Sequence, residues 1–354
     1  MKNYLHHLLY ILPIPLILLG LNYFVDPANL FRSDYESGIA NYLLSGNHVT
    51  NVINYNERIL QKLFIEKMER CPTTIVLGSS RIMQISSFNT KDSLLINDGV
   101  SGATLEDFVS IYYLYEKKGY HLKKVILGLD PWMLNDNHEQ DRWKSLAAEY
   151  NTFSSKLLGR KNENANAFNF YKLTILKELW SFSYFKSSLQ YAVNGIHVQY
   201  IPTHSIVNDG FTRLMDGSIS YDKAFRSVSL TEIDARAKSN MAGKTIYSLG
   251  NYTHFSEKYL VLLDKFVLYL QNQNTEVQFF LSPYHPLIYE HFSRSNYYSI
   301  VIKTENYFRN YAAEHHIKIM GSYNPAKYNF DHSWFYDGLH CKETAIEEIL
   351  KREN

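Results

Sequence analysis

The sequence has no excess of charge of either sign and no run of basic residues. Its 36 lysines and arginines nearly balance 35 aspartates and glutamates, which leaves a formal net charge of +1 over 354 residues. Proteins that bind nucleic acids usually carry a basic patch or stripe, because phosphates attract lysine and arginine. The composition therefore gives no electrostatic support to a nucleic-acid partner.

Cysteine is scarce, with Cys71 and Cys341 as the two examples. They could pair in an oxidising compartment. However, Cys71 precedes an expected strand, and Cys341 follows a histidine expected at the carboxyl end of that strand. The strand would hold them about 15–20 Å apart, whereas a disulfide needs Cα atoms within about 7 Å. We expect no disulfide.

Metal-ligand spacing is also missing. The chain has 14 histidines, but the adjacent pairs at 6–7 and 315–316 lie in an N-terminal apolar segment and at an expected helix end. Neither pair has the spacing of a metal site. We therefore expect neither a metal nor another cofactor.

Aromatic residues, by contrast, are abundant, with 29 tyrosines and 20 phenylalanines. Tyrosine-rich surfaces suit sugars, because the ring covers an apolar face while the hydroxyl forms hydrogen bonds, and they suit ordinary interfaces equally. With 45% hydrophobic residues, the chain can bury a large core. Its length allows one large domain or two modest ones.

The N-terminal residues contain the strongest targeting signal. Residues 8–21 are all apolar or Gly, Pro or Tyr, and residues 4–25 are about long enough to cross a bilayer. A cleaved signal peptide is the alternative, but small residues at cleavage-site spacing are missing before Asp26. We predict a single-pass membrane anchor over residues 1–25. The rest of the chain would lie outside the cytoplasm, because Lys2 precedes the apolar run and acidic residues follow it.

Short apolar runs alternate with amphipathic segments over most of the remaining chain. The alternation is typical of a parallel sheet with helices on both faces, and we predict an α/β fold with a five-stranded parallel sheet. Ligands bind at the carboxyl ends of the strands in such sheets. The expected strands are 73–78, 93–97, 123–130, 276–283 and 317–321, and the expected helices are 56–70, 104–119, 256–274, 298–316 and 342–353.

Residues 131–275 separate the third and fourth expected strands and lack a clear alternation of strands and helices. Asp216-Gly217, between alternating residues, predicts a β-hairpin there. A long insertion at the functional edge of a sheet is expected to shape the substrate site; a second domain is the alternative. The predicted organisation is the anchor, a linker and helix over 26–70, and a catalytic domain over 71–354 that carries the insertion.

Two adjacent serines, Ser79 and Ser80, follow the first expected strand. Turns at strand ends often contain Gly and Ser for conformational reasons, so this stretch alone does not identify a nucleophile. Near the C-terminus, Asp337 and His340 stand directly before the last expected helix. Such a pair is often structural, yet it also suits catalysis. A serine nucleophile needs a base, and the base needs an acceptor that fixes its tautomer.

The order of three stretches resembles the SGNH (GDSL-type) hydrolase superfamily. These are "GSS" after the first strand, "NDGVSGAT" after the second, and "DGLH" before the last helix. The resemblance covers about residues 73–130 and 276–345. It implies a flavodoxin-like three-layer sandwich with a five-stranded parallel sheet. It also implies that Ser80, the second residue after the glycine, is the nucleophile, with His340 as base and Asp337 as its partner.

The same resemblance implies an oxyanion hole made by the backbone N–H groups of Ser80 and Gly102. A helix beginning near Ser80 would independently leave its N–H unpaired and directed at an oxyanion. The third block of the family usually has Gly-x-Asn-Asp, whose Asn side chain completes the hole. Here Asp130 stands in the likely Asn position, and a carboxylate cannot donate unless it is protonated. Either Arg81 or an insertion residue replaces that donor, or the hole has two donors.

The stretches "LGSSR", "LDPW" and "SPYHP", together with the N-terminal anchor, look closer to one sub-group of the superfamily. Its members are membrane-tethered SGNH proteins of cell-surface polymer modification, similar to those of alginate acetylation and teichoic-acid D-alanylation. Ser79 fills a position where relatives often have Asp. His285, in "SPYHP", is expected either to line the site or to serve as a capping or structural histidine.

The resemblance implies extracytoplasmic ester hydrolysis or O-acyl transfer on a cell-surface glycan or related polymer. A membrane-bound O-acyltransferase would be a partner that supplies activated acyl groups. A different class of function is a membrane-tethered glycan-binding or assembly protein that keeps the scaffold without turnover.

Overall fold

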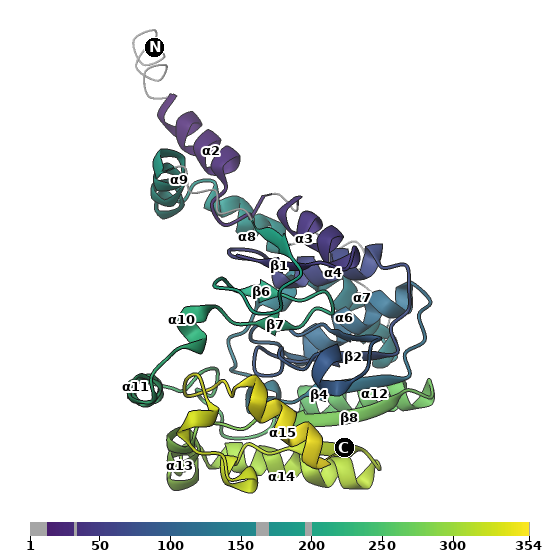
Figure 1. Ribbon diagram of the computed structural model, residues 1–354. Coiled ribbons are helices and arrows are strands. Elements are labelled where there is room, and N and C mark those ends of the chain that lie inside the picture. The colour runs from purple at the N-terminus through teal and green to yellow at the C-terminus, as the bar shows by residue number, and fades with distance from the viewer. Residues whose placement is uncertain (1–12, 32–33, 161–169, 195–199, 354) are drawn as a thin grey trace, which may run out of the picture.

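The computed structural model describes residues 13–31, 34–160, 170–194 and 200–353, and its centre is a five-stranded parallel sheet (Figure 1). All five strands lie where the apolar runs predicted them, so the predicted α/β fold with a parallel sheet is confirmed. In spatial order the strands are β3 (Leu95–Asn97), β2 (Thr74–Leu77), β4 (Lys124–Gly128), β8 (Glu276–Leu281) and β9 (Lys318–Gly321).

The spatial order of the strands reverses once, at β2. The chain passes from β2 to β3 on one side and then returns to form β4 on the other side of β2. Connections that leave a strand in opposite directions open a crevice at the carboxyl ends of the two strands, and ligands bind at this switch point in open α/β sheets. The loops after β2 and β4 therefore define the place where a site is expected.

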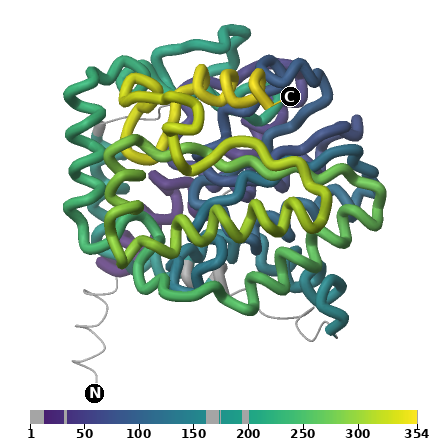
Figure 2. Tube along the Cα trace, turned by 90° about the horizontal axis from the view of Figure 1, so that it is seen from below, coloured from purple at the N-terminus to yellow at the C-terminus, as the bar shows by residue number. Residues whose placement is uncertain are grey.

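Alternate strand residues pack into two hydrophobic clusters, one on each face of the sheet. Ile75 and Phe279 belong to the larger cluster, whereas Val76 and Phe280 belong to the smaller one. The larger cluster includes residues of α4 (Glu57–Lys67), α6 (Leu105–Lys117), α12 (Glu257–Asn272) and α14 (Ser299–Glu314), and the smaller one is closed by α15 (Glu343–Glu353). Seen from below, α12 and α14 lie side by side (Figure 2), joined by a hydrogen bond from Tyr311 to Asp264.

The five predicted helices are present within one to three residues of their expected ends. A capping box starts α6, where the backbone N–H of Thr104 donates to Asp107 at 3.0 Å. Burial of the apolar face of each helix against the sheet explains why periodicity located them well. Shorter helices in the same part of the fold are α3 (Asp34–Leu44), α5 (Ser87–Thr90) and α13 (Pro286–Arg294), with the 3₁₀ helices η3 (Pro325–Tyr328) and η4 (His332–Trp334).

A second, antiparallel sheet joins the segment after the apolar N-terminus to the insertion. Its strands, in spatial order, are β5 (Ile201–Thr203), β1 (His48–Thr50), β6 (Thr212–Arg213) and β7 (Ile219–Ser220). The predicted hairpin at Asp216-Gly217 is confirmed between β6 and β7. Gly217 has a φ of +78°, and a Cβ there would lie 2.3 Å from the backbone oxygen of Asn97. The hairpin is thus pressed against the carboxyl end of β3.

The insertion contains most of the remaining elements and ends before α12, because α12 packs on α6 and leads directly into β8. Its backbone bonds to the turn that follows β2, where the N–H of Ile219 donates to the oxygen of Met83 at 3.0 Å. Its helices are η1 (Pro131–Leu134), η2 (Arg142–Leu146), α7 (Ala147–Leu157), α8 (Phe170–Glu178), α9 (Phe182–Asn194), α10 (Lys223–Arg226) and α11 (Leu230–Ala242).

The predicted membrane anchor begins outside the described residues, and its second half forms α2 (Pro13–Val25). Figure 1 shows α2 and α9 together at one end of the molecule. Apolar side chains are exposed on both helices, with Phe24 73% and Val193 76% exposed. Among the described helices, none has both the length and the apolar character that a bilayer crossing requires. The anchor stays a prediction.

Candidate active site

The turn after β2 separates the two serines by environment. Ser79 is fully buried, and its Oγ accepts a hydrogen bond from the backbone N–H of Arg81 at 3.2 Å. Ser80 is only partly buried, and its Oγ lies 2.9 Å from Nε2 of His340. The structure therefore places Ser80, and not Ser79, against the predicted base.

The loop before α15 holds Asp337 and His340 in one local arrangement. Oδ1 of Asp337 accepts from the backbone N–H groups of Leu339 at 2.7 Å and His340 at 2.8 Å. Its Oδ2 lies 2.9 Å from Nδ1 of His340. Burial raises the pKa of Asp337, but the imidazole and these N–H donors outweigh burial and lower the pKa to about 2. Asp337 is therefore an ionised acceptor at neutral pH.

Ser80, His340 and Asp337 form a continuous relay, although Ser80 and His340 are 260 positions apart in the chain. With Asp337 ionised, Nδ1 of His340 carries the proton and donates to it. Nε2 then offers its lone pair to the hydroxyl of Ser80. This arrangement can remove a proton from Ser80 and stabilise the imidazolium that results.

Arg81 connects the nucleophile turn to the strand ends and to the histidine loop. Its fully buried guanidinium donates to Asp130 Oδ1 at 2.6 Å, to the backbone oxygen of Leu339 at 3.0 Å and to that of Ser282 at 2.5 Å. It also lies 3.7 Å from the ring centroid of Tyr284. A side chain committed to these partners cannot reach an oxyanion in the open site. Arg81 is therefore a positioning residue and not the replacement donor.

Asp130 sits where the family pattern has its donating Asn. It is almost fully buried. Burial raises its pKa above the ordinary value, while Arg81 and a hydrogen bond from Ser79 oppose that shift. Asp130 thus accepts from the nucleophile turn instead of donating into the site. With Arg81 committed elsewhere, the hole implied by the resemblance has either a further donor from the insertion or the backbone donors of Ser80 and Gly102 alone.

The expectation of a helix beginning near Ser80 is wrong. Residues 80–84 form turns, closed by a bond from the Ile82 N–H to the oxygen of Ser79 at 3.1 Å, and α5 begins only at Ser87. Even so, no described residue accepts a hydrogen bond from the backbone N–H of Ser80 or of Gly102. Both N–H groups are thus unused within the described fold, although Gly102 itself is buried.

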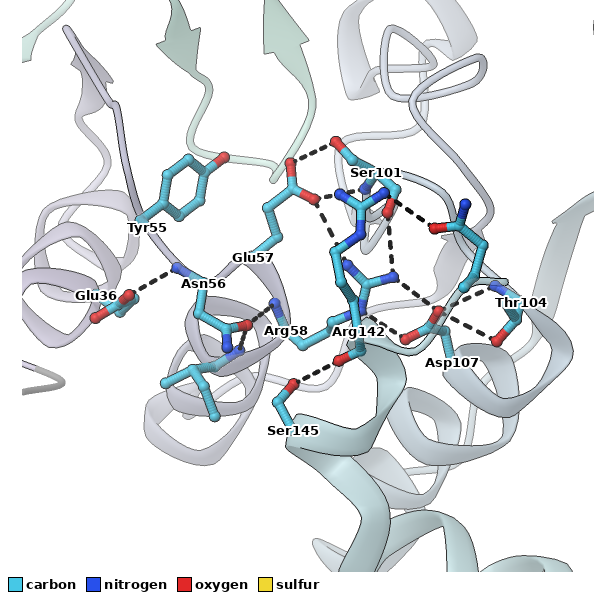
Figure 3. A network of polar contacts seen from close by, with 12 residues as sticks. Glu36, Tyr55, Asn56, Glu57, Arg58, Ser101, Thr104, Asp107, Arg142 and Ser145 are labelled. Carbon is cyan, nitrogen blue, oxygen red and sulfur yellow. Dashed lines mark hydrogen bonds and ion pairs between the residues drawn. The ribbon is translucent and has the colours of Figure 1, made fainter. Parts of the chain in front are cut away.

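The turn that contains Gly102 is held by a network of buried charges (Figure 3). Gly102 has a φ of +60°, which favours glycine. Its neighbour Ser101 donates its N–H and hydroxyl to the carboxylate of Glu57 at 2.5 and 2.9 Å. The oxygen of Ser101 accepts from Arg58 at 3.1 Å, and Arg58 forms a buried ion pair with Asp107 at 2.8 Å. The network fixes the turn before any ligand binds.

The insertion supplies an aromatic wall beside the relay. The hydroxyl of Tyr221 donates to the backbone oxygen of Ser80 at 3.3 Å. The rings of Tyr221 and Phe225 each lie 6.1 Å, centroid to centroid, from the imidazole of His340. The position of the insertion indicated a role at the site, but periodicity gave no signal for these two residues. They follow β7 in a loop and a short helix without amphipathic repeat.

His285 caps α13, which was one of its two expected roles. Its Nδ1 accepts from the N–H of Leu287 at 3.3 Å. Burial, reinforced by His332, lowers the pKa of His285 to about 4, so the ring is neutral. A neutral ring that accepts at Nδ1 carries its proton on Nε2, which lies 3.4 Å from Oδ1 of Asp234.

Asp234 therefore lies between two histidines, because Nδ1 of His332 is 2.6 Å from the same oxygen. Ligand atoms of the three residues lie within 4.8 Å of one another. The buried Nε2 of His285 has no hydrogen-bond partner among the described residues, so of the two histidines only His332 is hydrogen-bonded to Asp234. The trio lies where α11, α13 and η4 meet. Local spacing could not reveal it, because the three residues come from separate elements.

The two cysteines are free thiols. Cys71 lies before the amino end of β2, and Cys341 follows His340 directly. Cys341 is buried, with its Sγ 3.5 Å from the hydroxyl of Ser282. Burial raises the pKa of both thiols, so neither is an activated nucleophile.

A comparison of the chain with models of known protein families finds no match. A comparison with curated proteins likewise finds no match. The candidate site therefore rests on its geometry: a Ser–His–Asp relay at the carboxyl edge of a parallel sheet.

Proposed function

We propose that this chain is an SGNH-type serine esterase or O-acyltransferase that acts on acyl esters of a cell-surface glycan or related polymer. The observation that carries the proposal is the relay of Ser80, His340 and Asp337, with both links at 2.9 Å. The strand order, with the nucleophile after the first parallel strand and the base before the last helix, is the arrangement that the SGNH resemblance implies.

The reaction begins with attack of Ser80 Oγ on the ester carbonyl carbon, while Nε2 of His340 takes the hydroxyl proton. The N–H groups of Ser80 and Gly102 stabilise the negative oxygen of the tetrahedral intermediate. As the intermediate collapses, the C–O bond to the alcohol breaks, and His340 returns the proton to the leaving oxygen. Ser80 then carries the acyl group as an ester.

The second half of the reaction releases the acyl group. His340 takes a proton from the acceptor, which attacks the acyl-enzyme carbonyl, and Ser80 leaves with that proton. Water as the acceptor gives hydrolysis, and a sugar hydroxyl gives transfer. The aromatic wall of Tyr221 and Phe225 beside His340 supports a carbohydrate, because aromatic faces pack against the C–H faces of sugar rings.

An extracytoplasmic position at the membrane is part of the proposal. The apolar N-terminal segment and the exposed apolar side chains of α2 and α9 support it, because a membrane would cover surfaces that water does not favour. A membrane-bound O-acyltransferase that supplies activated acyl groups is the proposed partner.

The test is covalent labelling by a fluorophosphonate probe, compared between wild type, Ser80→Ala and Ser79→Ala. Labelling is expected in wild type and Ser79→Ala and should be lost in Ser80→Ala. If Ser80→Ala still reacts with the probe and Ser79→Ala does not, the nucleophile is Ser79 and not Ser80. A wild-type protein that neither reacts with the probe nor releases acyl groups from envelope polymers, yet binds glycans, would support the binding or assembly alternative.

A further inference from the structure

A cavity of about 1020 Å³ lies between the N-terminal segment, the Ser101 turn and the insertion. This volume is at the upper end of the range for small-molecule sites. Its walls are mostly apolar, with three aromatic residues among them, and a few polar groups converge on it. Its lining residues include Phe31, Glu36, Tyr55, Ser101, Arg142 and Phe211.

Glu36 gives the cavity an unsatisfied polar group. Its side chain is 1% exposed, and its Oε1 accepts from the backbone N–H of Asn56 at 2.8 Å. Its Oε2 has no hydrogen-bond partner among the described residues, and no described cation pairs with it. Buried polar atoms are nearly always paired, so an unpaired one at a cavity wall points to a ligand that supplies a partner.

The chemistry around Glu36 favours a hydroxyl over a charged group. Burial raises the pKa of Glu36, and a hydroxyl can donate to the carboxylate or accept from the protonated acid. Of the two arginines on the wall, Arg58 is neutralised by Asp107 at 2.8 Å, and the exposed Arg142 donates to Gln140 and Tyr247. An anionic ligand would meet Glu36 and Glu57 in the same space, which costs energy in a poorly solvated site.

None of the relay residues lines the cavity, but two of its wall residues contact or adjoin residues next to the relay. Phe211 on its wall packs against Tyr221 at 6.2 Å between ring centroids, and Tyr221 donates to the oxygen of Ser80. Ser101 on its wall directly precedes Gly102. The guanidinium of Arg142, another wall residue, lies 2.5 Å from where a Cβ on Gly102 would be. A ligand in the cavity is therefore one side chain away from the relay.

We infer that this cavity binds a neutral sugar unit of the polymer, with a hydroxyl bonded to Glu36 Oε2 and ring faces packed on Phe31, Tyr55 or Phe211. The assignment rests on the proposed function, because it places the sugar beside the acyl-transfer centre. It adds a subsite that the order of the motifs does not indicate, since Glu36 lies in α3, before the first strand of the main sheet.

The test measures binding and labelling separately on the full chain. Calorimetry would titrate neutral hexasaccharides (cellohexaose, maltohexaose, laminarihexaose and chitohexaose) into Ser80→Ala, which retains the cavity but not the nucleophile. At least one is expected to bind, and adding Glu36→Ala should weaken that binding at least tenfold. Glu314→Gln, which removes the same charge at an exposed position of α14, should leave it unchanged. Glu36→Ala in the otherwise wild-type chain should still react with the fluorophosphonate probe.

Three outcomes overturn the inference. One is that no hexasaccharide binds while wild type still labels. Another is that binding survives Glu36→Ala, which would place the sugar elsewhere. The third is that only an anionic hexauronate binds, and that it depends on Arg142. A wild-type protein that does not react with the probe would instead refute the proposed function. Failure of the subsite and failure of the proposed function are therefore distinguishable. Glu36→Gln is similar in size to the wild type and keeps one acceptor oxygen, so it should retain more sugar binding than Glu36→Ala. This variant checks that the loss of binding in Glu36→Ala is not caused by unfolding.

Discussion

Replacement of Asp337 by asparagine should affect activity and stability by amounts that follow from the geometry. The pKa of Asp337 falls from 3.8 to about 2 on folding, and a depressed carboxyl pKa contributes stability above the unfolded value. The shift contributes about 2 kcal/mol to the free energy of unfolding above pH 5. About half of this contribution remains at pH 3, and the rest is lost as the pH falls through 2. Asparagine removes this contribution.

The same replacement should lower kcat by about 10⁴, because an amide cannot hold His340 in the tautomer that accepts the Ser80 proton. Ester hydrolysis with a chromogenic acetate would measure activity, and urea unfolding at pH 7 and pH 3 would measure stability. The control is Asp331→Asn, which removes a carboxylate from the nearby cap of η4 and should leave kcat unchanged. An Asp337→Asn protein with full activity, or with a stability loss that does not shrink at pH 3, would refute the reasoning.

Three further variants test the supporting groups. Arg81→Met leaves Asp130 buried without its counter-ion and should cost about 3–5 kcal/mol in urea unfolding, and adding Asp130→Asn should recover part of that loss. Burial raises the pKa of Asp98 to about 8. The native state therefore binds its proton more tightly, and stability should fall as the pH rises from about 4 to about 8. Asp98→Asn should flatten that slope, and an unchanged slope would exclude Asp98 as its cause. Gly102→Ala places a Cβ at a φ of +60° and within 2.4 Å of Tyr247 Oη, so kcat/KM should fall by up to about 10³. Unchanged kinetics would show that Gly102 is not part of the proposed oxyanion hole.

The strands and long helices could be predicted from the sequence because each buries a continuous or periodic apolar surface against the same core. The hairpin at Asp216-Gly217 was equally predictable, since its turn needs a residue with positive φ. The second sheet was not. Its strands are two or three residues long, and His48 pairs with Thr203 across a long stretch of chain. No local pattern encodes a pairing of that kind.

The relay could be predicted because its members occur in a recognisable order, with Asp337 and His340 in one turn. The expected helix at Ser80 failed because the backbone after it closes short turns. The role of Arg81, which lies in that turn, could not be predicted. Its partners Asp130, Ser282 and Leu339 lie 49, 201 and 258 positions away in the chain. Only the folded sheet brings these strand ends together.

Asp130 stands where the SGNH resemblance would place a donating Asn, and its surroundings explain how a buried carboxylate is stabilised there. A buried carboxylate alone would be costly, but Arg81 neutralises it, and the same guanidinium bonds to the oxygen of Leu339, next to His340. The Ser79 hydroxyl also opposes the rise of the Asp130 pKa that burial causes. In the proposed mechanism the oxyanion has one side-chain donor fewer, and the charged link fixes Ser80 and His340 relative to each other. Rigid placement of the reacting groups lowers the barrier by reducing the entropy lost on reaching the transition state, and this offsets part of the lost electrostatic stabilisation.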